Sequence, residues 1–137
     1  MEPEIHITIK RETFYEMVYH CMQEKPLGAC GMLAGGAEKA DVLEKMTSVE
    51  SDSEDATSET IAHLETKSRL QGRGLKAFAH YRCHIEEKAR PSQYEIEAFS
   101  DPAMHLVIVS LQGSGVPLVK AYSITGSRVA GVRIEIE

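Results

Sequence analysis

Two short segments of the chain hold residue types that could do chemistry. They read AHYRCH at 79–84 and ARPSQYE at 89–95. Imidazole, thiolate and carboxylate groups are the ligands that transition metals take in proteins. On a strand, His80 and His84 would not share a metal, because residues four apart at about 3.3 Å per residue lie roughly 13 Å from each other. A metal site here would therefore need partners for His84 from elsewhere in the chain.

Each of these residues also has an ordinary structural interpretation. Ser92 and Glu95 match the S-x-x-E capping box of a helix, which explains both residues without catalysis. A histidine without ligand partners, such as His84, is commonly a hydrogen-bonded or exposed side chain. Cys83 should point away from His84, since neighbours on a strand face opposite ways. Cys30 belongs to an apolar segment and is expected to pack in the core.

The elements that position these residues follow from the hydrophobic pattern, which alternates in strands and repeats at 3.6 residues in helices. Strands are expected at Ile5–Lys10, Ala29–Gly36, Asp41–Val49, Lys76–His84, Met104–Leu111, Leu118–Ile124 and Arg128–Ile136. Helices are expected at about Arg11–Lys25, Ser58–Leu70 and Ser92–Phe99. This order predicts an α/β or α+β fold in which helices flank a mixed sheet in three layers.

Length, charge and cysteine content limit the function classes. The 137 residues suit a single domain, 1–137, and the net charge of −6 without a basic stripe argues against nucleic acid and against an anionic membrane surface. No apolar run is long enough to cross a membrane. The acidic N-terminus is unlike a signal peptide, and the odd cysteine count is typical of reduced thiols, so we expect a cytoplasmic location. The acidic segment Ser48–Thr60 is expected to be a surface loop.

Together with KPLGACGMLAG at 25–35, these segments resemble the bacterial branch of the JAB/MPN (JAMM) metallopeptidase family. The resemblance spans nearly the whole chain, and ACGMLAG and ARPS carry most of it. It implies the JAB/MPN fold, which is similar to that of cytidine deaminases. In active members, a glutamate before the ACGLL-like strand is the general base, and two histidines and an aspartate hold zinc. A serine helps to hold the oxyanion.

This chain departs from the family pattern at the positions that matter most. His84 and Ser92 match, and Glu95 stands at the aspartate's position, but Arg82 replaces the first histidine and Gly28 the general base. Arginine is always protonated and does not ligate a metal. A guanidinium about 4 Å from a divalent ion would repel it by roughly 8 kcal/mol. We therefore expect no catalytic residue and no bound cofactor, and we expect Arg82 to take the metal's place and pair with Glu95.

Two functions remain open from the sequence. Inactive family members act as scaffolds and dimer partners, so the first expectation is a non-catalytic domain that binds a protein or peptide, with a homo- or hetero-dimer possible. Active bacterial relatives cleave ubiquitin-like sulfur-carrier proteins, so the partner could be a ubiquitin-like C-terminal tail whose carboxylate binds Arg82. The second is a zinc-dependent peptidase or isopeptidase with altered ligands, in which His84 and Glu95 bind zinc and Glu86 or Glu87 acts as base.

Overall fold

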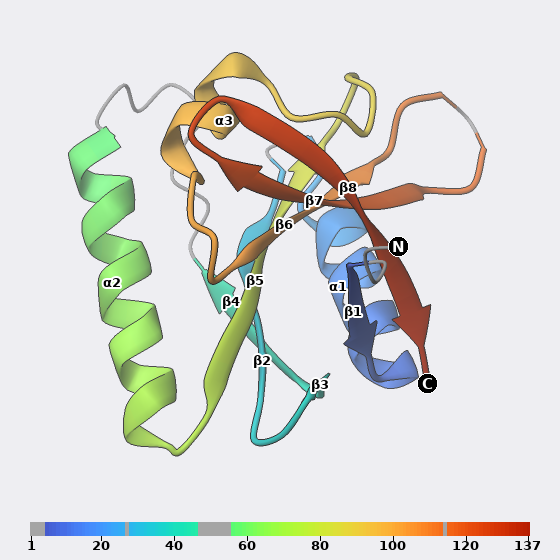
Figure 1. Cartoon of the computed structure of the whole chain (residues 1–137). Helices are drawn as coiled ribbons and strands as arrows, with labels where there is room; N and C mark the ends of the chain where they lie inside the picture. Colours follow the sequence, from blue (N-terminus) through green and yellow to red (C-terminus); the bar gives the residue numbers. More distant parts are fainter. Residues whose placement is uncertain (1–4, 27, 47–55, 114) are drawn as a thin grey trace.

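Helices interleave with the strands of one mixed sheet in the computed structural model, which describes residues 5–26, 28–46, 56–113 and 115–137 (Figure 1). The strands are β1 (His6–Ile9), β2 (Cys30–Gly35), β3 (Lys39–Ala40), β4 (Val42–Met46), β5 (Lys76–His84), β6 (His105–Ser110), β7 (Leu118–Thr125) and β8 (Arg128–Ile136). The helices are α1 (Arg11–Gln23), α2 (Ala56–Gly72) and α3 (Gln93–Ala98). Within these ranges, no helix has the length and apolar character needed to cross a membrane.

The predicted order of elements is confirmed, with two corrections. A short strand, β3, precedes the predicted partner of β2, and that partner, β4, pairs antiparallel with β2 as expected. Helix α2 begins at residue 56, two residues before the predicted helix start at Ser58, so the predicted acidic loop and the helix overlap over 56–60. The rest of that predicted loop, 48–55, lies outside the described residues, as do positions 47–49 of the strand predicted to end at Val49.

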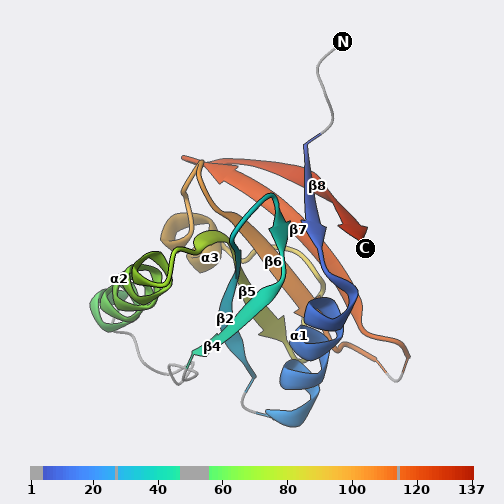
Figure 2. The ribbon, with the colours of Figure 1, turned by 90° about the horizontal axis from the view of Figure 1, so that it is seen from below.

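The sheet curls so far that its two ends meet. Its strand order is β3-β1-β8-β7-β6-β5-β2-β4, with both parallel and antiparallel pairs. β3 and β4 stand at opposite ends of this order, yet only Asp41 separates them in the chain. The strands must therefore bend around one face, and Figure 2 shows α1 lying on that side of the sheet.

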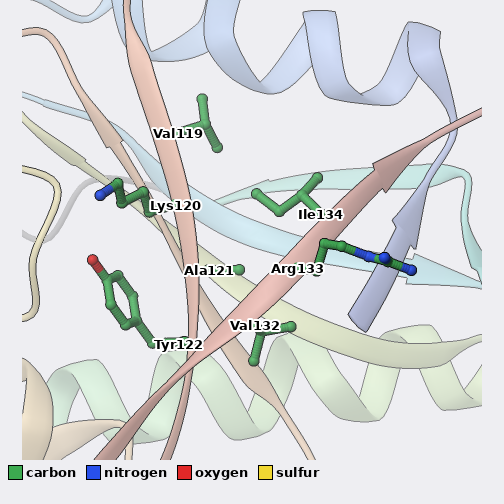
Figure 3. Close-up of a pocket in the computed structure, with 8 residues that line it drawn as sticks. Val119, Lys120, Ala121, Tyr122, Val132, Arg133 and Ile134 are labelled. Atoms are coloured by element: carbon green, nitrogen blue, oxygen red, sulfur yellow. The ribbon is translucent and has the colours of Figure 1, made fainter. Parts of the chain in front are cut away.

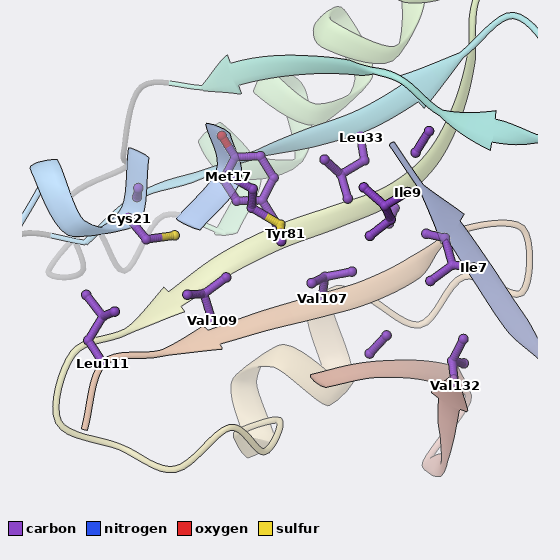
Figure 4. Packing of buried hydrophobic residues seen from close by; sticks show 14 residues of the cluster. Ile7, Ile9, Met17, Cys21, Leu33, Tyr81, Val107, Val109, Leu111 and Val132 are labelled. Atoms are coloured by element: carbon purple, nitrogen blue, oxygen red, sulfur yellow. The ribbon is translucent and has the colours of Figure 1, made fainter. Parts of the chain in front are cut away.

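Apolar clusters cover both faces of the sheet and create three layers. The largest cluster packs α1 on the curled face, where Met17 and Cys21 meet Tyr81 of β5 (Figure 4). On the opposite face, Leu70 of α2 packs in a second cluster with Met32 of β2, and a third cluster lies around α3. The predicted arrangement of a mixed sheet between helices is therefore confirmed.

Tyr81 fixes the position of β5 against its neighbours. The side chain is fully buried, and its hydroxyl lies 2.7 Å from Nδ1 of His20 in α1. The ring occupies the space beside Gly31, where an added Cβ would lie only 2.5 Å from Tyr81 and from the carbonyl oxygen of Glu44. Glycine is therefore needed at position 31, where β2 packs closely against Tyr81.

Candidate functional site at the end of strand β5

The candidate site lies at the carboxyl end of β5, beside the parallel strand β6 and the amino end of α3. Because successive side chains on a strand alternate, Arg82 and His84 point to the same face. A cavity of about 450 Å³ opens there, with Arg82, His84, Ser92 and Glu95 in its lining. The fold therefore brings together four of the residues that the sequence pattern assigns to one site.

Glu95 is the residue that joins the others. Its side chain is 3% exposed, and its Oε2 accepts a hydrogen bond of 2.9 Å from Nε of Arg82. Nε2 of His84 lies 2.9 Å from Oε1 and 3.0 Å from Oε2 of the same carboxylate. Two basic side chains therefore share one buried carboxylate, and the predicted pairing of Arg82 with Glu95 is confirmed.

Glu95 also caps helix α3. Its Oε1 accepts a 2.9 Å hydrogen bond from the backbone N–H of Ser92, and the hydroxyl of Ser92 accepts a 3.1 Å bond from the N–H of Glu95. This reciprocal pair is the capping box that the sequence predicts. One carboxylate therefore holds both the start of the helix and two basic side chains.

Both ring nitrogens of His84 face hydrogen-bond acceptors. Nδ1 lies 2.7 Å from the carbonyl oxygen of Lys88, and Nε2 faces Glu95. A neutral imidazole carries one N–H, so only the imidazolium can donate to both acceptors. Burial lowers the pKa of His84, but the hydrogen bonds and the charge of Glu95 outweigh burial and raise the pKa above its usual value of 6.5. The surroundings therefore favour the protonated form of His84.

Glu95 remains ionised in spite of its burial. Desolvation raises the pKa of its carboxyl group, whereas the hydrogen bonds from His84 and Ser92 and the charges of His84 and Arg82 lower it by more. The net result is a pKa below the usual value of 4.5. The site thus holds a buried carboxylate between two cations.

Arg82 is held in place by aromatic rings as well as by Glu95. Its Cζ lies 5.1 Å from the ring centre of Phe99 and 5.7 Å from that of Tyr94, distances at which a cation is attracted to the ring face. The side chain is 25% exposed and lines the cavity. Arg82 is therefore anchored on one side and accessible on the other.

Gly28, at the position of the family's general base, lies close to the end of β5. A Cβ added to it would lie 3.8 Å from the carbonyl oxygen of Cys83, an ordinary contact. The backbone φ of Gly28 is +88°, however, a conformation that glycine adopts readily and other residues rarely do. A glutamate here would have space for its side chain, but it would strain the backbone by about 1–2 kcal/mol.

The other candidate residues surround this cluster without joining it. Cys83 packs with the α1 cluster, on the opposite side of β5 from His84, as predicted. Cys30 is half-buried and packs against the cluster on the α2 face. Glu86 and Glu87 are exposed on the cavity wall. Within residues 5–26, 28–46, 56–113 and 115–137, no three His, Cys, Asp or Glu side chains converge as a metal-binding group.

A second histidine environment, farther back on β5, was missed by the sequence patterns. The ring centre of His80 lies 4.6 Å from that of His63 in α2 and 4.9 Å from that of Phe99. Its Nδ1 is buried and has no hydrogen-bond partner among the described residues. Burial is the main cause that lowers the pKa of His80 to about 3. Strand alternation places His80 on the same face as His84. No sequence pattern within β5, however, indicates that α2 covers only His80.

The zinc ion that the resemblance implies does not fit these side chains as they stand. The carboxylate oxygens of Glu95 are engaged by Arg82, His84 and the N–H of Ser92. The protonated form of His84 offers no lone pair to a metal, and Arg82 stands as a cation where a ligand is needed. No step of metal-assisted hydrolysis follows from this arrangement.

Comparison with known proteins was informative only at the level of structure, since no family model and no curated protein matches the sequence. A protein from Desulfitobacterium hafniense superposes with a TM-score of 0.76 at 22% identity, over 96% of this chain and 92% of its own. A JAB1/MPN domain protein from Archaeoglobus fulgidus gives 0.68 at 17% identity, over 96% and 98%. A structure described as a JAMM metalloprotease-like zinc site in the proteasome and signalosome gives 0.64 at 16% identity, over 96% and 98%. Similarity of this extent at such low identity defines the fold, and this chain has the JAB/MPN-like fold.

Proposed function

We propose that this chain is a non-catalytic JAB/MPN-fold domain that binds another protein. The observation that carries the proposal is the ion-pair network of Arg82, His84 and Glu95, in which Arg82 donates to Glu95 at 2.9 Å and His84 contacts the same carboxylate. These three side chains satisfy one another. A catalytic zinc site needs neutral imidazole ligands and an open coordination position, and this network supports neither.

A divalent ion would have to compete with the network. It would need to remove the proton from His84, whose pKa is raised, and to displace the guanidinium of Arg82 from Glu95. Breaking a buried ion pair costs roughly 3–5 kcal/mol. That is a substantial part of the roughly 10–16 kcal/mol that a structural zinc site provides. We therefore expect weak zinc binding and no metal-dependent hydrolysis.

The cavity supports the binding of a peptide end. Arg82 lines it with a planar guanidinium, the group that best matches a carboxylate. Glu86 and Glu87 on the cavity wall would repel an acidic peptide, so a neutral tail fits better. We propose the glycine-ended C-terminal tail of a ubiquitin-like protein as the partner, bound through its free carboxylate. A homo- or hetero-dimer would be compatible with this arrangement.

Metal analysis tests the non-catalytic part of the proposal. Wild-type protein dialysed after exposure to zinc is expected to retain clearly substoichiometric metal. Arg82→His places an imidazole at a ligand position and is expected to raise zinc affinity in calorimetry, whereas Arg73→His, at an exposed arginine outside the site, is not. Stoichiometric zinc in the wild type that is lost in His84→Ala would contradict the proposal.

Peptide titration tests the binding part. A glycine-ended peptide is expected to bind the wild type about tenfold more tightly than Arg82→Gln, because a charge-assisted hydrogen bond contributes roughly 1.5–3 kcal/mol. The same peptide with an amidated C-terminus is expected to lose a similar factor. Equal affinity for the two peptides, or for the two proteins, would remove Arg82 as a carboxylate receptor.

One observation favours a zinc peptidase with altered ligands as a second candidate. Nδ1 of His84 faces the carbonyl oxygen of Lys88 at 2.7 Å, and metal-binding histidines commonly donate their second N–H to such a carbonyl. In this case Nε2 of His84 and Glu95 would bind zinc after Arg82 has moved away. Peptidase activity that a chelator abolishes, together with loss of zinc in His84→Ala, would favour this candidate over the first.

A further inference from the structure

Strands β7 and β8 separate before they end. Their antiparallel pairing runs from the hairpin turn as far as the pair of Ala121 with Val132. Beyond this pair, β7 continues back to Leu118 and still pairs with β6 on its other side. β8 likewise continues to Ile136 and pairs with β1. Two neighbouring strands therefore diverge inside the sheet, as the two views in Figures 1 and 2 show.

Strand alternation shows which backbone groups face this opening. The N–H of Arg133 donates to the carbonyl of Ile5 on the β1 side, so the N–H and C=O of Ile134 point to the other side, toward β7. On β7, Ala121 pairs with Val132 of β8. Val119 lies two residues away from Ala121 on the same strand, so its N–H and C=O point to the same side, toward β8. Strand edges of this kind accept an added strand through main-chain hydrogen bonds.

The opening is hollow and has an apolar inner side. Its volume is about 590 Å³, and Figure 3 shows side chains from both strands around it. Val119, Ala121, Val132 and Ile134 belong to the apolar cluster on the α1 face or pack against it. An extended peptide placed here would cover this part of the core with every second side chain.

The outer side of the opening is basic. Lys120 and Arg133 line it, and a second hollow of about 230 Å³ continues from Lys120 to Lys88 and Arg90. All four of these side chains belong to exposed residues. Arg133 also contacts Glu135 on its own strand, but the described residues that line the two hollows include no carboxylate. In a chain whose net charge is −6, this basic surface is complementary to an acidic partner.

We propose that the groove between the diverging parts of β7 and β8 binds an extended acidic segment of a partner protein by strand addition. The backbone of the segment pairs with Val119 or Ile134. Apolar side chains at alternate positions point toward the α1 face, and acidic side chains between them meet Lys120 and Arg133. The preferred sequence therefore alternates apolar and acidic residues. This binding is separate from the proposed function, because the groove contains neither Arg82 nor Glu95.

Titration of the full isotope-labelled chain with a synthetic peptide, followed by NMR, tests this proposal. The peptide alternates glutamate with valine or threonine. Two matched peptides carry lysine in place of glutamate, or N-methyl groups on alternate backbone amides. We expect the first peptide to shift the amide signals of Val119, Lys120 and Ile134. The N-methylated peptide keeps its charge but cannot pair as a strand on its methylated edge, so its affinity is expected to fall at least about tenfold.

Matched variants locate the charge contacts. Lys120→Ala is expected to weaken binding about fivefold, the upper range for an exposed charge pair, whereas Lys45→Ala, an exposed lysine on β4, leaves it unchanged. Amidation of the C-terminus of the peptide is also expected to leave binding unchanged, which separates this groove from the cavity at Glu95, where a free carboxylate would bind. Thermal melting confirms that each variant is folded.

Several outcomes would overturn the proposal. Equal binding of the N-methylated peptide would show that no strand is added. Signal shifts confined to the end of β5 would place the peptide in the other cavity. Binding of single-stranded RNA at these residues without binding of the peptide would show that the basic surface recognises nucleic acid. If millimolar peptide shifts no amide signal, the groove between β7 and β8 does not bind such a segment.

Discussion

Strand β5 carries two buried histidines on one face, four residues apart, with opposite charge preferences. His84 is 7% exposed and His80 is 8% exposed. Burial lowers the pKa of both, yet that of His84 is raised overall because Glu95 and a backbone carbonyl accept from its ring. The pKa of His80 falls to about 3, and its Nδ1 has no partner in the described part of the chain. Although the exposed fractions are similar, deeper burial and nearby positive charges keep His80 neutral, whereas the carboxylate of Glu95 favours the charged form of His84.

The largest expected effect comes from removing the acceptor. Glu95→Gln leaves Arg82 and His84 without a carboxylate and is expected to lower the free energy of unfolding by about 3–5 kcal/mol. It should also lower the pKa of His84, so that His84 behaves like His80, which NMR titration would detect. Glu97→Gln, an exposed position on the same helix, is the control in urea unfolding. Similar losses in both variants would mean that the buried network contributes little.

The next effect in size concerns His80 and acid. An unfolded chain protonates this histidine below pH 6.5, but the folded chain resists protonation down to about pH 3, so its contribution to stability falls as the pH falls through this range. At up to about 1.4 kcal/mol per pH unit, the loss between pH 6.5 and 4.5 is about 2–3 kcal/mol. His80→Phe is expected to remove this part of the pH dependence in urea unfolding, whereas His6→Gln is not. If the free energies of unfolding of His80→Phe and of the wild type depend on pH in the same way, the pKa of His80 is not lowered in the folded protein.

His84 is expected to show the opposite pH dependence. Its pKa is raised on folding, so its contribution is fully present below pH 6.5 and is lost as the pH rises through the raised pKa. His84→Gln is expected to be less stable than the wild type by about 2 kcal/mol at pH 6. The difference should shrink toward pH 9. A difference that stays constant or grows with pH would mean that His84 is neutral in the folded protein.

The smallest effect tests whether the helix cap positions the carboxylate. Ser92→Ala removes the hydroxyl that accepts from Glu95 N–H and is expected to cost about 1 kcal/mol. Ser127→Ala, at an exposed turn residue, should change stability by less than about 0.5 kcal/mol. The pKa of His84 should stay raised in Ser92→Ala, since the carboxylate itself remains. A pKa that returns to the usual range would show that the cap also orients Glu95.

Local patterns were sufficient to predict most of the elements and the helix cap at Glu95, and the family resemblance predicted the pairing of Glu95 with Arg82. β5 and β8 have the predicted bounds, because alternation along a strand is a property of neighbouring residues. The Arg82–Glu95 pair was predictable because the family pattern places both positions at one site. The capping box was predictable because it depends on only four consecutive residues.

Features that depend on distant contacts were not predictable from such patterns. The two-residue strand β3 exists because the curled sheet brings Lys39 and Ala40 beside β1. The environment of His80 depends on the packing of α2 over β5. The positive φ of Gly28 and the separation of β7 from β8 are properties of the tertiary structure. None of these leaves a periodic signal in the sequence.

The backbone at Gly28 opposes the introduction of a larger residue at this position. With φ at +88°, a glutamate at this position would have a strained backbone. Its side chain would also point in a different direction from that of a residue in a regular extended conformation. A design that places a carboxylate here would therefore need to change the backbone conformation at position 28 as well as the residue.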